Sequence, residues 1–490
     1  MNLFVLFITS IVMASQGNTA KVQGFLQDRL AEKSFITAPI LVYMKDTADL
    51  TMISEDMSVE EKRKQVYDLL RNTAMHSQAS LKSFLDSKNV SYKAFYITNV
   101  IAIDSAGASL IDELSARADV RKVSYNPSIK HDDLQPSIEK IIESITTVES
   151  SLTYVKADRV WNELGVKGKG IVVAGQDTGV QWDHPALIHQ YRGLSDKGTD
   201  HNYNWHDSIH ANDGGNSCGS NLSSPCDDNQ HGSHTMGTIV GSDGGNNQIG
   251  IAPEAKWMAC RNMDAGVGTP ATYIECFEFF LAPYPIGGNA MTDGDTSMAP
   301  HVINNSWGCP PSEGCEGDEF VPVLKALEEA GVMVVVSAGN AGSGCGTIED
   351  APAHNSANVL SVGAMNHQTG QIASFSSRGP SRFDGAIGPG VAAPGVNIRS
   401  SVPGSTYAQF GWSGTSMAGP HVAGEVALMW SANPKLIGQV KKTRDLIYKT
   451  ARAKAASVSC GEDVNAIPNN TFGHGIIDIY EAVKAAQALE

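Results

Sequence analysis

Short apolar segments alternate with helical patterns in the second half of the chain, and this alternation restricts the fold more than any other feature. The apolar segments are rich in β-branched residues and lie at 171–174, 302–305, 332–337 and 359–363, and a helical pattern covers 321–330. Strands that alternate with helices form parallel sheets covered by helices. The sequence therefore predicts an α/β fold, a doubly wound and mostly parallel sheet with helices on both faces.

The first of these strands ends in an acidic residue. Residues 171–180 read IVVAGQDTGV, which places Asp177 at the C-terminal end of a buried strand. Open α/β sheets place their functional sites at this edge. Asp177 is therefore a candidate site residue.

A turn of small residues near the end of the chain presents a serine. Residues 413–424 read SGTSMAGPHVAG and lead into an apolar run that ends at Trp430. We expect Gly414 to allow a sharp bend and Pro420 to lie near the start of a buried helix, where its missing N–H costs nothing. Ser416 would then lie at a helix N-terminus, where backbone N–H groups stabilise an anion. A surface loop before an ordinary helix is the alternative.

A serine hydroxyl is a poor nucleophile unless a base lies beside it, and that base needs a third group to orient it. Residues 229–235 read NQHGSHT and contain two histidines. His231 is the candidate base. Either histidine could instead be a plain core residue.

Three ordered motifs in this chain resemble those of the subtilisin-like serine peptidases, the subtilases: DTG at 177–179, HGSHT at 231–235 and GTSMAGPH at 414–421. The order Asp177, His231, Ser416 is also the order of the subtilisin triad. The resemblance covers roughly residues 150 to 485 and is nearest the bacillopeptidase F-like branch. It implies a secreted serine endopeptidase in which Ser416 attacks the peptide bond, His231 moves the proton and Asp177 orients the histidine.

The resemblance also implies roles for residues around the nucleophile. Asn340 would donate to the oxyanion beside the Ser416 backbone N–H, and His234 would be structural. Two segments would bind the substrate backbone from opposite sides: Ser306, Trp307 and Gly308 on one, and Gly266, Val267 and Gly268 on the other. By residue type alone, Asn340 could belong to an ordinary turn and Trp307 to the core. Sedolisins, which share the Gly-Thr-Ser nucleophile, have Glu and Asp where this chain has His231 and Asn340.

The N-terminal region divides into a leader and a small unit. Residues 3–14 form an apolar run suited to a signal peptide, which we assign to 1–17, although no Lys or Arg precedes the run. A buried N-terminal strand or helix is the alternative. Residues 18–130 predict a βαββαβ unit with strands at 39–44, 92–96, 100–104 and 120–125, a helix after a capping box at 58–61 and a second at 110–114.

This small α+β, ferredoxin-like unit resembles the inhibitory propeptide of subtilases, and a permanent accessory domain is the alternative. Residues 131–148 are polar and are predicted to be the processing junction, and residues 149–490 the peptidase domain. A self-processing zymogen is therefore expected.

All eight cysteines lie between Cys218 and Cys460. An even number in a secreted chain predicts disulfides. Two pairs are close enough in sequence to staple loops, Cys218 with Cys226 and Cys309 with Cys315. Cys260, Cys276, Cys345 and Cys460 remain, and eight cysteines allow about 105 pairings. A zinc site is the alternative, disfavoured because no CxxC pair is present. Residues 186–230 are predicted to be a long surface loop.

The net charge of −16 and the lack of a basic cluster argue against a nucleic-acid partner. No membrane span is expected. The predicted partners are protein or peptide substrates and the propeptide itself, in the secretory or endolysosomal pathway or outside the cell. No cofactor is predicted; calcium is usual in the family, but the acidic loops specify no ligands, so no metal residue is assigned. An exopeptidase or peptide ligase on the same scaffold and a catalytically dead protein-binding relative are the alternative functions.

Overall fold

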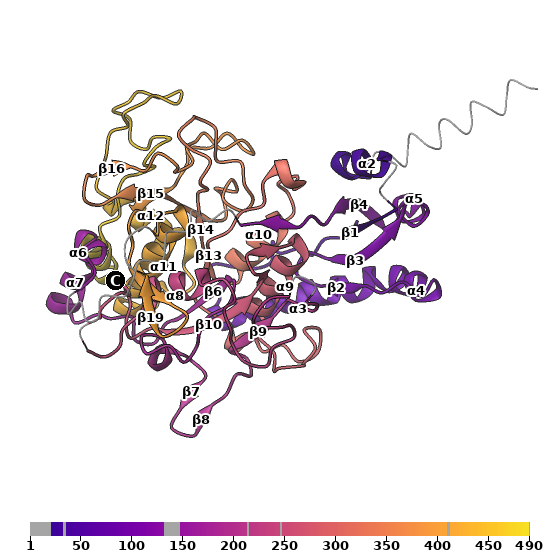
Figure 1. The fold of residues 1–490 in the computed structure, drawn as a ribbon, viewed down its shortest axis with the longest axis horizontal. Coiled ribbons are helices and arrows are strands. Elements are labelled where there is room, and N and C mark those ends of the chain that lie inside the picture. Colours follow the sequence, from indigo (N-terminus) through magenta and orange to yellow (C-terminus); the bar gives the residue numbers. More distant parts are fainter. Residues whose placement is uncertain are drawn as a thin grey trace, which may run out of the picture.

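The computed structural model describes residues 21–32, 36–131, 148–212, 215–245, 247–408 and 412–489. The predicted signal peptide and residues 132–147 of the predicted junction lie outside these ranges. Figure 1 shows two units, an N-terminal unit of residues 21–131 and a C-terminal unit of residues 148–489, packed side by side. In the described ranges, no helix is both long and apolar enough to cross a membrane.

The N-terminal unit is a four-stranded antiparallel sheet with the order β2-β3-β1-β4. The helix α3 begins at the predicted capping box, in which Ser58 and Glu61 bond to each other's backbone N–H groups. The βαββαβ order of the prediction is confirmed, but the first predicted helix is divided into α3 and α4, and a short helix before β1 was not predicted. The elements are α2 Gly24–Ala31, β1 Thr37–Met44, α3 Val59–Ser77, α4 Ala79–Ser87, β2 Lys93–Phe95, β3 Val100–Gly107, α5 Ala108–Ala116 and β4 Val120–Tyr125.

The C-terminal unit is built around an eight-stranded sheet. Its strands run in the order β16-β15-β14-β13-β6-β10-β9, with β17 paired to β15, and all pairs except β15 with β16 are parallel. The predicted α/β fold class is confirmed. The strands are β6 Val172–Asp177, β9 Trp205–Asp207, β10 Lys256–Arg261, β13 Val302–Asn305, β14 Met333–Ser337, β15 Leu360–Asn366, β16 Gln371–Ile372 and β17 Val391–Pro394.

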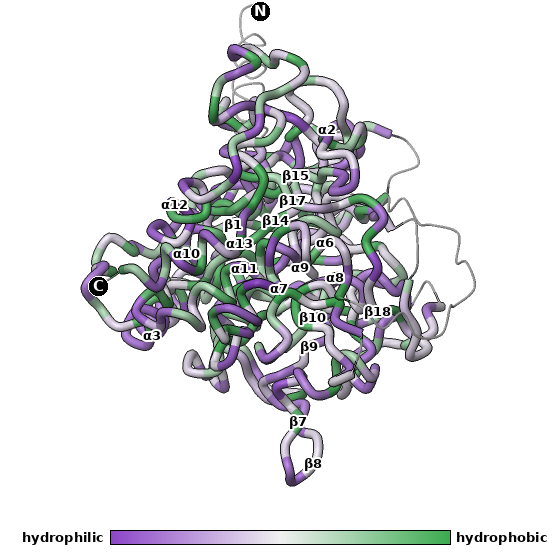
Figure 2. The backbone as a smooth tube through the Cα atoms, turned by 90° about the vertical axis from the view of Figure 1, so that its left-hand side faces the viewer, coloured by the Kyte–Doolittle hydropathy of each residue, from purple (hydrophilic) through white to green (hydrophobic). Residues whose placement is uncertain are grey.

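Both faces of this sheet are buried, which explains the near-continuous apolar strands. In β14, Val335 faces a core shared with α11, whereas Val334 and Val336 face a second core that contains α9 and α10. Figure 2 shows the hydrophobic stretches concentrated in the interior, with the β7–β8 hairpin projecting away from it. The remaining helices of the unit are α6 Ser150–Tyr154, α7 Ala157–Arg159, α8 His231–Val240, α9 Pro270–Leu281, α10 Val321–Glu329, α11 Thr415–Ala432, α12 Val440–Thr450 and α13 Ile479–Gln487.

The segment 186–230 is more than the predicted surface loop. It contains the hairpin β7 Leu194–Ser195 and β8 Gly198–Thr199, but it also supplies β9, which adds to the edge of the central sheet. Trp205 of β9 is fully buried. The prediction of a loop throughout this segment was wrong because one large apolar side chain anchors a strand within a polar sequence.

Four disulfides join the eight cysteines within the C-terminal unit. Cys218–Cys226 and Cys309–Cys315 are the two predicted loop staples. Cys260–Cys276 joins β10 to α9, and Cys345–Cys460 spans 115 residues of sequence. The zinc alternative is excluded because each sulfur is already bonded.

The N-terminal unit docks on the face of the sheet that α9 and α10 cover (Figure 1). Arg63 of α3 donates to the carbonyl oxygens of Ala299 and Pro300. Glu278 of α9 accepts the backbone N–H groups of Tyr96 and Ile97 at 2.6 and 3.1 Å. The last described residues of the N-terminal unit, 129–131, lie near the C-terminal ends of the strands of the large sheet.

Candidate functional site

The predicted site residues come from separate strands that end at one edge of the sheet. Asp177 ends β6, residues 306–308 follow β13, and Asn340 follows β14 by three residues. Ser416 lies in the first turn of α11. Because β13 lies between β6 and β14, parallel pairing brings these strand ends together.

Asp177 and His231 are hydrogen-bonded. His231 Nδ1 lies 2.7 Å from Asp177 Oδ1, and both side chains are buried. Asp177 also accepts the backbone N–H of Thr178 and the hydroxyl of Thr235. A carboxylate held in this way keeps the proton of a neutral imidazole on Nδ1, so that Nε2 can accept a proton. In this structure the Nε2 of His131 lies 3.4 Å from the Nε2 of His231.

Two glycines of the motifs allow the acid and the base to approach each other. A side chain at Gly179, whose φ is +105°, would overlap the Cys226 carbonyl oxygen. A side chain at Gly232 would overlap the carbonyl oxygen of Gly179. The turn after β6 therefore packs directly against the loop and first turn of α8, as only glycine permits.

Asp227 holds the start of α8, a role that the sequence analysis missed. Its carboxylate accepts the backbone N–H groups of Asn229, Gln230 and Ser233 and the hydroxyl of Thr178. This ties the acid segment to the base segment. Its position four residues before His231 was the available signal, because acidic side chains stabilise helix N-termini.

His234 has the structural position expected of it. Its Nε2 lies 3.0 Å from the Ile398 carbonyl oxygen, and its ring stacks on Trp412. It is fully buried, and its carbonyl oxygen accepts the hydroxyl of Ser400 in β18 Ser400–Val402.

Ser416 and Ser306 bond to each other twice. The Ser416 hydroxyl donates to the Ser306 carbonyl oxygen at 3.1 Å, and the Ser306 hydroxyl donates to the Ser416 carbonyl oxygen at 3.2 Å. The second bond explains Pro420, which lies inside α11 rather than in its first turn. Proline removes the N–H that would bond the carbonyl four residues earlier, and that carbonyl belongs to Ser416. The prediction that the missing N–H has no consequence at a helix start was wrong.

Gly414 also differs from expectation. Its backbone is extended, with φ 170°, and an added Cβ would have no contact shorter than 3.6 Å. A sharp bend at Gly414 was therefore a wrong explanation of the motif. The Ser416 backbone N–H still lies in the first turn of α11, where the helix supplies unpaired donors.

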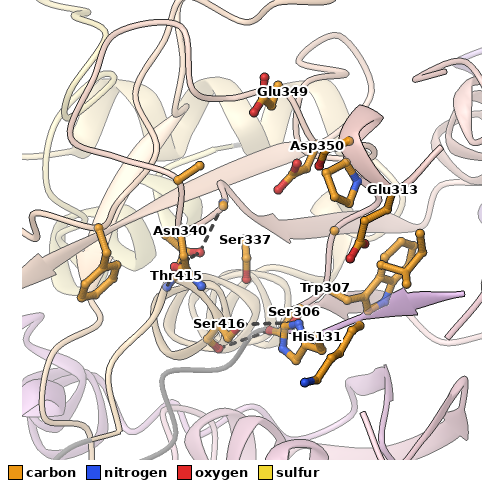
Figure 3. A pocket seen from close by; sticks show the side chains of 18 residues that line it. His131, Ser306, Trp307, Glu313, Ser337, Asn340, Glu349, Asp350, Thr415 and Ser416 are labelled. Carbon is orange, nitrogen blue, oxygen red and sulfur yellow. Dashed lines mark hydrogen bonds between the residues drawn. The ribbon is translucent and has the colours of Figure 1, made fainter. Parts of the chain in front are cut away.

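Asn340 lies beside the serine with its amide oriented. Its Oδ1 accepts the backbone N–H and the hydroxyl of Thr415, both at 2.9 Å. The oxygen is thereby occupied, and Nδ2 remains as a donor toward the cavity that Asn340 lines. In Figure 3, Asn340 and Ser416 lie on the same side of this cavity.

A segment of the N-terminal unit lies in the groove next to the serine. The strand β5 Ile129–Lys130 pairs antiparallel with β12 Val267–Gly268, and the His131 N–H donates to the Gly266 carbonyl oxygen at 2.9 Å. The ring of His131 packs on that of His231 with centroids 4.6 Å apart. The predicted edge strand thus pairs with an extended segment of the same chain.

The cavity beside Ser416 has a volume of about 480 Å³. Ser306, Trp307 and Gly308 line one wall, and Ser337, Gly339 and Asn340 another (Figure 3). Trp307 also belongs to the core, because it stacks on Tyr273 at 3.9 Å and is almost fully buried. The structure therefore brings together the predicted serine, oxyanion donor and substrate wall, and it adds acidic residues that were not predicted.

Within the described part of the chain, no group of three or more His, Cys, Asp or Glu side chains is placed to hold a metal ion. The acidic loops noted in the sequence use their carboxylates elsewhere. Asp228 pairs with the buried Arg261 at 2.6 Å, and Asp293 and Asp295 accept backbone N–H groups of their own turns. Calcium ligands therefore remain unassigned.

Comparison with known proteins gives the same family from several directions. The model of the subtilase family matches residues 168–475. Bacillopeptidase F of Bacillus subtilis is 36% identical over 446 residues, which are 87% of this chain and 29% of that protein. Subtilisin Savinase of Lederbergia lenta is 34% identical over 290 residues, 59% of this chain and 86% of the relative. Subtilisin E of Bacillus subtilis is 28% identical over 407 residues, 83% of this chain and 91% of the relative. The chain thus spans less than a third of Bacillopeptidase F.

Proposed function

Because the chain belongs to the subtilase family, we propose that it is a secreted serine endopeptidase made as a self-processing zymogen. The observation that carries this proposal is the pairing of β5 with β12, which sets an extended peptide in the groove beside Ser416 and His231. That peptide is an internal segment, preceded by a folded unit and followed by the rest of the chain. A groove that accepts an internal segment favours an endopeptidase over an exopeptidase.

The proposed reaction begins at Ser416. Its hydroxyl must turn from the Ser306 carbonyl oxygen toward His231 Nε2, which takes the proton as the oxygen attacks the peptide carbonyl. The negative charge on the former carbonyl oxygen is stabilised by the Asn340 Nδ2 and the Ser416 backbone N–H. Asp177 stabilises the imidazolium, His231 then protonates the leaving amine, and water hydrolyses the acyl-enzyme through the same steps.

The N-terminal unit would act first as an inhibitor and then as a substrate. Its strand β5 occupies one substrate-binding edge, so other peptides are excluded by competition. Cleavage of a peptide bond after His131 would then be a reaction within one molecule, and such intramolecular reactions are fast. We therefore propose that residues 18–130 are an inhibitory propeptide and that cleavage falls within 131–148.

The test compares the purified full-length precursor with its Ser416→Ala variant. The wild-type precursor should yield a mature fragment whose N-terminus lies within residues 132–148, and a diphenyl phosphonate should label Ser416. The variant should stay uncut and unlabelled. Lack of labelling in the processed wild-type protein would favour the dead relative, and maturation of the pure variant would refute self-processing.

A further inference from the structure

Three carboxylates line the cavity next to Ser416: Glu313, Glu349 and Asp350. Figure 3 shows Asp350 and Glu313 across the cavity from Ser416, with Trp307 beside Glu313. The cavity is the one whose walls carry the proposed oxyanion donor and the proposed substrate-binding residues. A substrate side chain that enters it would therefore meet negative charge.

Asp350 lies between the two walls. A Cβ added to Gly308 would lie 3.0 Å from its Oδ2, and a Cβ added to Gly339 would lie 3.3 Å from the same atom. Because both neighbours are glycines, no wall side chain stands between them and the carboxylate. Asp350 is therefore placed where the tip of a long side chain would arrive.

The charge of Asp350 has no cation to balance it among the described residues. Glu349 already pairs with Arg382 at 2.7 Å. Burial and the negative charges of Glu349 and Glu313 together raise the pKa of Asp350 to about 6, and no positive group acts on it. A half-buried carboxylate in this setting is stabilised by an incoming cation more strongly than an exposed one would be.

Two residues of the segment that already occupies the groove have basic side chains. Lys130 and His131 both line the cavity beside Ser416. Trp307 adds an apolar wall, which suits the methylene stem of a long basic side chain. Charge and shape thus both point to one class of side chain.

We propose that Asp350 determines specificity in this cavity and that the enzyme cleaves after lysine or arginine. This inference rests on the proposed peptidase function. Asp350 binds the ammonium or guanidinium group and takes no part in the bond-breaking steps. Glu349 and Glu313 both add to the negative potential at Asp350.

The test uses the processed enzyme and peptide p-nitroanilides that differ only in the residue before the scissile bond: lysine, arginine, norleucine and glutamate. Norleucine matches the lysine stem without its charge. At pH 8 the kcat/KM for lysine should exceed that for norleucine about 10- to 100-fold. Each factor of ten corresponds to about 1.4 kcal/mol of binding free energy. Glutamate should be the poorest substrate.

The lysine-to-norleucine ratio should also depend on pH. Asp350 is ionised well above its pKa of about 6 and protonated well below it, so the ratio should fall as pH drops from 8 to 5. The other charged groups that face Asp350 are Glu313 and Glu349. Taking the ratio removes any effect of pH on the bond-breaking steps, because both substrates share those steps.

Asp350→Asn should reduce the ratio at pH 8 to within about threefold of one and abolish its pH dependence. Glu349→Gln is the matched control and should keep most of the ratio, because its charge is already paired. Thermal unfolding shows whether Asp350→Asn folds. If it does not, the inference is tested with Asp350→Glu, which keeps a carboxylate, and with the wild-type ratio and its pH dependence.

A wild-type enzyme that cleaves norleucine as well as lysine would overturn the inference and leave the peptidase function intact. A lysine preference that survives in Asp350→Asn would overturn the role of Asp350. If no peptide is cut and the phosphonate does not label Ser416, the proposed function fails and the inference fails with it.

Discussion

The N-terminal and C-terminal units form their hydrophobic cores in different ways. The C-terminal unit has a core on the α8 and α11 side of its sheet that is formed entirely by its own residues, and it carries four disulfides. The N-terminal unit has no cysteine, and the two faces of its sheet pack in two different cores. In β1, Ile40 and Val42 pack within the unit, whereas Leu41 and Tyr43 pack in the core that contains α9 and α10.

The N-terminal unit therefore completes its hydrophobic core only against the C-terminal unit. Small domains bury too little surface to be very stable alone. Here one face of a small sheet is finished by another unit, with polar anchors such as Lys122, which lies 2.7 Å from Glu316 and 2.5 Å from Asp318. A unit that is stable when docked and less stable when released is suited to act as a temporary inhibitor.

The substitution with the largest expected effect removes the catalytic activity of the C-terminal unit and leaves both folds intact. Ser416→Ala should lower kcat about 10⁶-fold, the loss seen when subtilisin itself lacks its nucleophile. The two units should then remain covalently joined. Hydrolysis of a peptide p-nitroanilide by the wild type and the variant measures the effect, and turnover within tenfold of wild type would exclude Ser416 as the nucleophile.

The disulfides should matter to one unit only. Replacing both Cys345 and Cys460 with serine opens a loop of 115 residues, and the chain-entropy model gives about 5 kcal/mol for a loop of this size. Chemical denaturation of the mature C-terminal unit should show this loss. Replacing Cys309 and Cys315, which close a much shorter loop, is the control and should cost less.

Asn340→Ala should slow hydrolysis about 10²- to 10³-fold, as the equivalent loss of an oxyanion donor does in subtilisin. Asn340→Asp keeps the oxygen that accepts from Thr415 but replaces the Nδ2 donor with an acceptor. It should be at least as slow. If Asn340→Asp retains wild-type kcat, the amide acts only as a structural bridge to Thr415.

The smallest effect is expected at the interface between the two units. Glu278→Ala leaves the N–H groups of Tyr96 and Ile97 without their acceptor. This loss should weaken the binding of the N-terminal unit by about 2 kcal/mol. Residues 18–130 added in trans should then inhibit the mature enzyme about 30-fold more weakly. Glu278→Gln keeps an acceptor oxygen and should lose less, and neither variant should change kcat. Equal inhibition of all three enzymes would show that these bonds add nothing to docking.

Several features followed directly from the sequence. The apolar strands, the capping box at Ser58, the βαββαβ order and the three motifs all reflect local periodicity or local spacing, which a sequence displays. The cysteine count and the close spacing of two pairs indicated two of the four disulfides. By contrast, the pairing of Cys260 with Cys276 required knowing that α9 packs beside β10.

Other features were decided only by tertiary structure. Trp205 makes β9 a strand of the sheet although its surroundings read as a loop, because burial of one large side chain outweighs local polarity. Pro420 is tolerated inside α11 because Ser306, more than a hundred residues away, bonds the carbonyl it leaves free. Asp350 lies beside the cavity of Ser416 only because strands β13 and β14 are neighbours in the sheet. Sequence spacing determines which residues share a strand or a helix turn, whereas strand order determines which strand ends meet around one cavity.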